Sequence, residues 1–271
     1  MTHAGLSAFG AAALVAAFYV TLAYLILPAL WSYYEHEPGL KELPMRTVTA
    51  QGIPGDPLNV GLVGTPEDVL LALQAAGWSP ADPITFKTSI EIAGSVLLDH
   101  PDPYAPVSNL FYDGRRQDLA FERPVGKSAD QRHHVRFWRA LDAGKEGRPV
   151  WLGAATFDKG VGVSRYTGAI THHIRADVDA ERDGLLADLS RAGRLAQIYL
   201  VSGIGPTLRA RNGGGDPFHT DGDVRIGVIG SGAASIGGEP QMLSLPNSVV
   251  MKNVAWASGK SVLERAGLLP E

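Results

Sequence analysis

The stretch from Thr171 to Asp183 holds the densest group of chemically useful side chains in the sequence, THHIRADVDAERD. Two adjacent histidines run into four carboxylates and two arginines, and an apolar helical pattern follows. Imidazoles and carboxylates can bind a metal ion or move a proton, and arginines can hold a phosphate group. The stretch therefore predicts where a site lies, and it leaves the reaction open.

Two pairs of adjacent histidines, His133–His134 and His172–His173, lie in segments that alternate like strands. Neighbouring side chains on a strand point to opposite faces, so only one histidine of each pair can enter a given site. If the two strands are neighbours, one imidazole from each meets the other on the same face. Asp177 and Asp179 lie where the second strand passes into a helix, which allows a site of two histidines and one carboxylate.

Arginines in the same segments favour an anion over a bare cation. Clustered guanidinium groups disfavour a divalent ion unless an anion accompanies it, and they form bidentate contacts with phosphate or carboxylate. We therefore expect Arg116, Arg136 and Arg175 to bind an anionic ligand. The candidates for proton transfer or catalysis are His133, His134, His172, His173, Asp177 and Asp179. The sequence names no cofactor, and it leaves a metal requirement open.

Structural roles compete at each of these positions. Carboxylates between 177 and 183 suit a helix N-terminus, where they cap free N–H groups and favour the helix dipole. A strand histidine can serve packing alone, and Arg115–Arg116 at a hairpin tip can form a solvated turn. The polar residues that follow the glycines at 213–215 fit a surface loop. Ser258–Ser261 has the end of a phosphate-binding loop, but Val254 stands at the first glycine position.

The elements that must position these groups indicate an α+β fold, a mainly antiparallel sheet with flanking helices. An Asp-Gly turn predicts a hairpin between 107–112 and 119–121, and 195–201 is expected to pair with 224–229. The remaining predicted strands are 58–63, 133–138, 149–154 and 168–174. The predicted helices are 65–77, 88–98, 179–191 and 248–266, the first two of which begin with capping boxes.

An uncharged apolar run from Leu6 to Trp31 predicts a membrane-spanning helix that precedes the fold. A cleaved signal peptide is the alternative, although the run lacks a basic start and ends in interfacial aromatic residues. We predict an anchor over 1–32, a linker over 33–55, an α+β domain over 56–235 and a helical tail over 236–271 that packs on the domain. The expected location is a bacterial cell membrane, crossed once, with the domain on the extracytoplasmic side.

Composition limits the classes of partner. The chain has 271 residues and a net charge of -4, with a pI near 6.1, which argues against a nucleic-acid-binding surface. The absence of cysteine excludes disulfides and thiolate metal sites. The expected partners are the lipid bilayer, through residues 6–31, and a membrane protein.

Several sequence words, taken together and in order, resemble the LssY C-terminal-like domain family over roughly residues 56–193. They are Asp56–Val60, Gly77–Pro83, Pro106–Ser108, Gly114–Phe121, Arg132–Trp138, Trp151–Asp158 and the stretch Thr171–Asp183. The family has no established catalytic activity. Its members can be joined to membrane segments resembling type 2 phosphatidic acid phosphatases and DedA-like proteins, which implies work near membrane lipids or their phosphorylated carriers. The phosphatase part is missing here, so no phosphatase residues carry over.

Three hypotheses of function follow. In the first, a membrane-tethered domain binds a phosphate-bearing or otherwise anionic ligand at the membrane surface, and whether it also processes that ligand is left open. In the second, the same histidines and aspartates hold zinc or manganese for hydrolysis. In the third, the chain is a non-catalytic assembly subunit of a membrane protein complex, since it has an anchor and a long linker but lacks a decisive catalytic motif.

Overall fold

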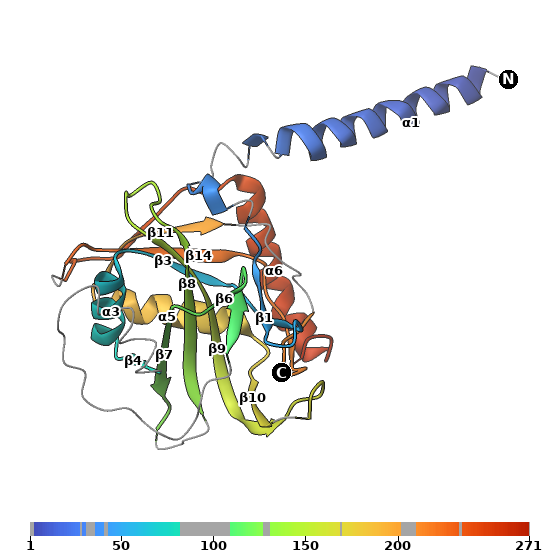
Figure 1. The fold of residues 1–271 in the computed structure, drawn as a ribbon. Coiled ribbons are helices and arrows are strands. Elements are labelled where there is room, and N and C mark those ends of the chain that lie inside the picture. The colour runs from blue at the N-terminus through green and yellow to red at the C-terminus, as the bar shows by residue number, and fades with distance from the viewer. Residues whose placement is uncertain are drawn as a thin grey trace.

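The computed structural model describes most of the chain. The described residues are 3–27, 29–30, 36–40, 43–81, 109–126, 131–168, 170–201, 210–232 and 235–270. The helix expected over 88–98 lies outside them. Figure 1 shows one folded body and an N-terminal helix that projects from it.

A nine-stranded, mainly antiparallel sheet forms the centre of the folded body, in the order β15-β11-β14-β3-β9-β8-β7-β4, with β10 also on β9. The α+β class predicted from the sequence is thereby confirmed. Only β14–β3 and β11–β15 pair in parallel among the described strands. The strands are β3 (Val60–Val63), β4 (Ser79–Pro80), β7 (Leu119–Pro124), β8 (Arg132–Leu141), β9 (Val150–Val163), β10 (Ile170–Ile174), β11 (Leu195–Val201), β14 (Val224–Ile229) and β15 (Gln241–Met242).

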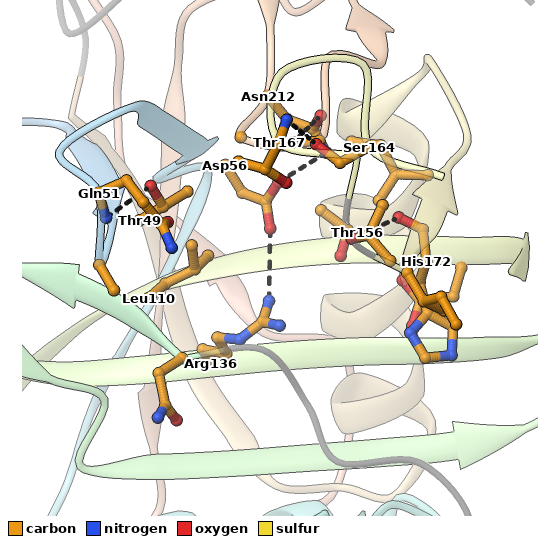
Figure 2. Close-up of a pocket in the computed structure, with 18 of the residues that line it drawn as sticks. Thr49, Gln51, Asp56, Leu110, Arg136, Thr156, Ser164, Thr167, His172 and Asn212 are labelled. Atoms are coloured by element: carbon orange, nitrogen blue, oxygen red, sulfur yellow. Dashed lines mark hydrogen bonds and ion pairs between the residues drawn. The ribbon is translucent and has the colours of Figure 1, made fainter. Parts of the chain in front are cut away.

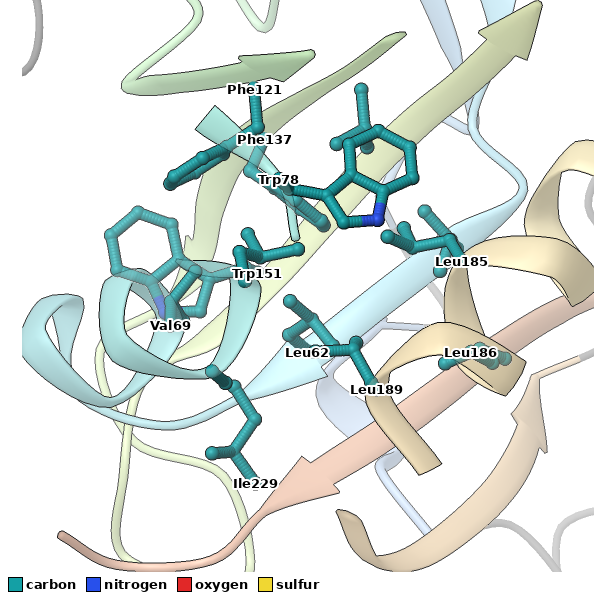
Figure 3. Close-up of a cluster of buried hydrophobic side chains, with 14 of the residues drawn as sticks. Leu62, Val69, Trp78, Phe121, Phe137, Trp151, Leu185, Leu186, Leu189 and Ile229 are labelled. Carbon is teal, nitrogen blue, oxygen red and sulfur yellow. The ribbon is translucent and has the colours of Figure 1, made fainter. Parts of the chain in front are cut away.

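Two helices cover one face of this sheet, α3 (Pro66–Ala75) and α5 (Val178–Arg191). The apolar sides of the helices pack against every second side chain of the strands, and together these residues form one buried cluster. Burial contributes roughly 1.5–3 kcal/mol to stability for each large apolar side chain. Figure 3 shows this cluster, which includes Leu62, Val69, Trp78, Phe121, Phe137, Trp151, Leu185, Leu186, Leu189 and Ile229. The described residues also include α6 (Asn247–Arg265), as the sequence predicts, and the short helix η2 (Pro38–Leu40).

The opposite face of the large sheet carries a second buried cluster, which includes Trp138 of β8 and Leu152 of β9. Odd and even positions of β8 therefore face different cores, as strand geometry requires. Part of this face is covered by a four-stranded sheet in the order β2-β1-β5-β6. Its strands are β1 (Arg46–Thr49), β2 (Pro54–Pro57), β5 (Leu110–Tyr112) and β6 (Arg115–Arg116), and a separate pair joins β12 (Ala210–Arg211) to β13 (Pro217–Phe218).

Two sequence interpretations change in this region. Strand β1 and the start of β2 lie within 33–55, which the sequence indicates as a linker, because their hydrogen bonds come from distant β5 as well as from each other. The Asp113–Gly114 turn forms with positive φ at both residues, but it joins β5 to β6. The predicted partner, 119–121, belongs to β7 and pairs with β8 in the other sheet. The expected pairing of 195–201 with 224–229 is confirmed.

The N-terminal helix is the candidate membrane span. Helix α1 (His3–Thr21) continues into a π-helical turn, η1 (Leu22–Ile26). The window Phe9–Ile26 has a mean hydropathy of 2.1, and none of it is buried by the rest of the chain. It is therefore long and apolar enough to cross a membrane, a property that signal sequences near an N-terminus share. The side of the membrane and the bacterial location stay predictions from the sequence.

Helix α3 begins with the capping box that its sequence predicts. Thr65 Oγ1 accepts a hydrogen bond from Asp68 N, and Asp68 Oδ2 accepts one from Thr65 N. Pro66 follows at the first helical position, where its missing N–H has no cost. The helix then buries Val69, Ala72 and Leu73 in the core.

We expect replacement of Thr65 by alanine to lower the free energy of unfolding by about 1 kcal/mol, because an N–H at the start of α3 loses its acceptor. Urea unfolding of the full chain in detergent micelles measures this. The matched control is Thr65→Ser, which keeps the hydroxyl oxygen and should stay close to the parent protein. Equal losses in the two variants would show that the cap contributes nothing.

Candidate functional site

A cavity of about 290 Å³ lies on the sheet face opposite α3 and α5, between the two sheets. Figure 2 shows the polar side chains that point into it. They come from segments far apart in the sequence, and several are charged. The polar lining includes Thr49, Gln51, Asp56, Arg132, Arg136, Thr156, Asp158, Ser164, Thr167, His172 and Asn212.

Strand register explains why these side chains meet. On β8, Arg132 and Arg136 are separated by four positions and therefore share one face. On β9, Thr156 and Asp158 share that face, since Arg132 lies opposite Asp158 and Arg136 lies opposite Ala154. The small residue at Ala154 leaves room above the sheet for the long Arg136 side chain.

Two buried guanidinium groups form the base of the cavity. Arg132 and Arg136 are each 7% exposed. Arg132 donates from Nε to Asp158 Oδ2 at 3.1 Å and from Nη1 to Glu122 Oε2 at 2.9 Å. Arg136 donates from Nη1 to Asp56 Oδ2 at 3.3 Å (Figure 2). Each guanidinium therefore has a carboxylate beside it, and the cavity carries both signs of charge.

Asp56 is the acidic group at the centre of this network. Asn212 Nδ2 donates to its other carboxyl oxygen at 3.2 Å. Burial raises the pKa of Asp56 above its ordinary value of 3.8, although Arg136 and the Asn212 hydrogen bond act in the opposite direction. A carboxyl group with a raised pKa stays protonated up to a higher pH than a solvated one.

Two buried polar atoms near the cavity have no hydrogen-bond partner within the described part of the chain. They are Nε2 of His134 and Oγ1 of Thr156, which lie opposite each other on β8 and β9. Burial, and then the nearby Arg136 and Arg132, hold the pKa of His134 well below its usual range, so this imidazole is neutral. A buried polar atom without a partner costs roughly 1–3 kcal/mol, which a ligand oxygen or an ordered water would recover.

The histidine pairs separate as strand alternation predicts, but their strands are not neighbours. Strand β9 lies between β8 and β10 and pairs with both. His172 lines the cavity, whereas Nδ1 of His173 lies 2.7 Å from Asp216 Oδ1. His133 faces the helix-covered side, with Nδ1 2.8 Å from Glu181 Oε1.

The two candidate aspartates belong to helix α5 rather than to the cavity lining. Asp177 is the N-cap and accepts from Ala180 N at 3.2 Å, and its carboxylate also contacts Lys260. Asp179 is buried and accepts from Thr220 Oγ1 and Asp221 N, each at 2.6 Å. Burial raises the pKa of Asp179 to about 6, against the opposing effect of Arg182.

The predicted ligand-binding arginines lie in three different places. Arg136 lines the cavity. Arg116 is exposed on β6, and the Arg175 guanidinium is exposed and lies 4.1 Å from the centre of the Phe157 ring. The cavity instead recruits residues that the sequence did not single out as site residues, among them Asp56, Thr156, Asp158 and Asn212.

A signal for some of these residues exists in the sequence. Thr156 and Asp158 continue the alternation of the predicted strand 149–154 with polar residues on one face. The histidines and aspartates of the metal-hydrolase hypothesis do not converge as a three-donor group within the described ranges. The donor group found there is His36, Glu37 and Glu146, at another place in the fold.

Comparison with known proteins gives one match. Residues 40–224 match the family described as LssY C-terminus, which is more than half of the chain. The matched range is wider than the resemblance over 56–193, and it includes every strand that contributes to the cavity. No curated protein and no solved structure matches the chain.

Proposed function

The chain belongs to the LssY C-terminus family, and we propose that its domain binds a phosphate-bearing or otherwise anionic ligand in the cavity between the two sheets. The observation that carries this proposal is the pair of buried guanidinium groups, Arg132 and Arg136, at the base of the cavity. Arginine forms directed, charge-assisted hydrogen bonds with phosphate oxygens. His172 and the hydroxyls of Thr156 and Ser164 supply further polar groups around the same space.

The size of the cavity suits a small headgroup. Its volume of about 290 Å³ is just below the usual range of ligand pockets, roughly 300–1,000 Å³. A phosphate group with a short substituent fits this space, and a larger molecule would extend through the opening. The candidate membrane helix at Phe9–Ile26 supports a ligand that is presented at a membrane surface.

The protonation state of Asp56 is expected to control the affinity for an anion in the cavity. When Asp56 is charged, it neutralises Arg136 at 3.3 Å and opposes an incoming anion. Because the pKa of Asp56 in the folded protein is raised, its charge is lost as the pH falls through that raised value. The positive charge of Arg136 is then no longer offset by Asp56, so anion affinity is expected to rise as the pH falls.

The experiment is a titration of the full chain, in detergent micelles, with sulfate and with inorganic phosphate. Sulfate keeps a constant charge, so its pH dependence reports the protein. We expect Asp56→Asn to strengthen sulfate binding at about pH 8 by about tenfold, ~1.4 kcal/mol, and to remove most of the pH dependence.

The matched control is Asp142→Asn, which makes the same change of net charge on an exposed side chain. It should leave both the affinity and its pH dependence unchanged. If neither anion binds the parent protein and Asp56→Asn binds no better, the proposal fails. Vesicles that contain phosphatidic acid then distinguish a lipid headgroup from a free phosphate.

A further inference from the structure

A second cluster of ionisable side chains lies apart from the cavity, where the segment after the membrane helix meets the domain. His36 and Glu37 belong to that segment, and Glu146 lies in the turn between β8 and β9. One nitrogen of the imidazole and one oxygen of each carboxylate lie within 4.8 Å of one another. His36 Nε2 is 2.5 Å from Glu146 Oε1.

Internal contacts leave this cluster incomplete. Glu146 Oε2 is buried and has no hydrogen-bond partner among the described residues. The same holds for the hydroxyl of Tyr199, a residue that is 1% exposed. The centre of the Tyr199 ring lies 4.4 Å from the centre of the His36 ring.

The surrounding backbone holds one carboxylate in place. Lys145 N donates to Glu37 Oε1 at 2.7 Å. A side chain at Gly144 would place its Cβ 2.5 Å from the same oxygen, so this approach requires glycine. Oriented ligands with fixed hydrogen-bond partners are typical of metal sites in proteins.

The charge of the cluster calls for a cation. Glu37 is 3% exposed, and one of its carboxylate oxygens lies within 4.8 Å of a carboxylate oxygen of Glu146. Two carboxylates and one imidazole without a thiolate are ligands that Zn²⁺ accepts, usually with four donors at about 2.0–2.2 Å. The Tyr199 hydroxyl or a water molecule can occupy the fourth position.

We propose that His36, Glu37 and Glu146 bind one Zn²⁺ ion that fastens the segment after the membrane helix to the β8–β9 turn. The ion joins residues about 110 positions apart in the sequence, as the His36–Glu146 contact already does. Its role is to fix the orientation of the domain relative to the anchor. This inference is independent of anion binding in the cavity.

The test is metal binding by the full chain in detergent micelles, after removal of bound metal with a chelator. We expect one Zn²⁺ per chain by calorimetry, and a Co²⁺ spectrum typical of four-coordinate geometry. His36→Gln and Glu146→Gln should each weaken Zn²⁺ binding by at least about 100-fold. His133→Gln is the matched control, because it alters the other histidine–glutamate pair, His133–Glu181, and should bind Zn²⁺ as the parent does.

Thermal unfolding separates loss of metal from loss of fold. Zn²⁺ should raise the unfolding temperature of the parent protein and of His133→Gln, but not that of Glu146→Gln. The Glu146→Gln variant is still expected to fold, because its amide oxygen can accept the hydrogen bond from His36. The proposal is overturned if the parent binds no Zn²⁺, or if His36→Gln and Glu146→Gln bind it as tightly as the parent. In either case the cluster holds a shared proton instead.

Discussion

Replacement of Arg136 by glutamine is expected to weaken sulfate and phosphate binding by about 30-fold, ~2 kcal/mol, which is the usual contribution of a charge-assisted hydrogen bond. Arg136 is the buried cation whose charge Asp56 offsets when Asp56 is ionised. The variant removes both this charge and the directed donors of the guanidinium group. Calorimetric titration at about pH 6 measures the loss. Arg136→Lys should recover part of the affinity, because it keeps the charge but not the planar fork.

The variant also leaves Asp56 buried without its partner, and the fold has to be checked for that reason. Removal of one partner of a buried ion pair destabilises a protein by roughly 3–5 kcal/mol. The double variant Asp56→Asn with Arg136→Gln replaces the ion pair by a neutral amide pair, so it should regain stability while anion binding stays weak. Unfolding in urea compares the free energies of unfolding of the parent protein, Arg136→Gln and the double variant.

Arg116→Gln is the matched control, since Arg116 is exposed on β6 and outside the cavity lining. It should bind anions as the parent does. If Arg116→Gln loses affinity and Arg136→Gln retains it, the anion site lies at the β5–β6 hairpin and the cavity is not the site. The pair of variants therefore decides between two of the arginines that the sequence predicts, Arg116 on the exposed hairpin and Arg136 in the cavity.

Local signals in the sequence predict much of the fold. The capping box at Thr65 and Asp68 begins α3, and Asp177 caps α5 just before its predicted start. The alternation at His133–His134 and His172–His173 predicts correctly that each pair divides between two faces. Hydrogen bonds within a turn and the period of a strand are set by neighbours in the sequence, which explains this success.

Long-range pairing explains what the sequence did not show. Strand β9 runs for 14 residues and pairs with β3, β8 and β10 along its length, whereas local patterns indicated only its first part. Asp56 lies in a segment rich in proline and glycine that becomes a strand by pairing with β1, and β1 in turn pairs with the distant β5. Asn212 reaches Asp56 across 156 positions, a separation that no periodicity can report.

Asp179 and Asp183, two of the four carboxylates in the Thr171–Asp183 stretch, belong to an ion network around the buried Arg182. This guanidinium is 0% exposed. It donates to both carboxyl oxygens of Asp221, at 2.8 and 3.0 Å, and to the backbone oxygen of Asp223 at 2.9 Å. Asp179 joins the same network through Nη1 of Arg182 at 3.3 Å. The network ties α5 to the segment that enters β14.

We expect Arg182→Ala to lower the free energy of unfolding by roughly 3–5 kcal/mol, because Asp179 and Asp221 would stay buried without their cation. Against a total stability of about 5–15 kcal/mol, such a loss is a large fraction of the free energy of unfolding. Urea unfolding of the full chain in detergent micelles measures it. The loss should be smaller near pH 5, since Asp179, with a pKa of about 6, is then mostly neutral.

Arg191→Ala supplies the control from the same helix, because this arginine is exposed and its loss should cost less than about 0.5 kcal/mol. The triple variant Arg182→Met with Asp179→Asn and Asp221→Asn removes the buried charges together and should recover part of the stability, since neutral groups need no counter-ion. A loss in Arg182→Ala no larger than that in Arg191→Ala would show that the network does not hold α5 in place. The carboxylates of this stretch would then be available for a ligand, and the first interpretation of Thr171–Asp183 as a chemical site would regain its basis.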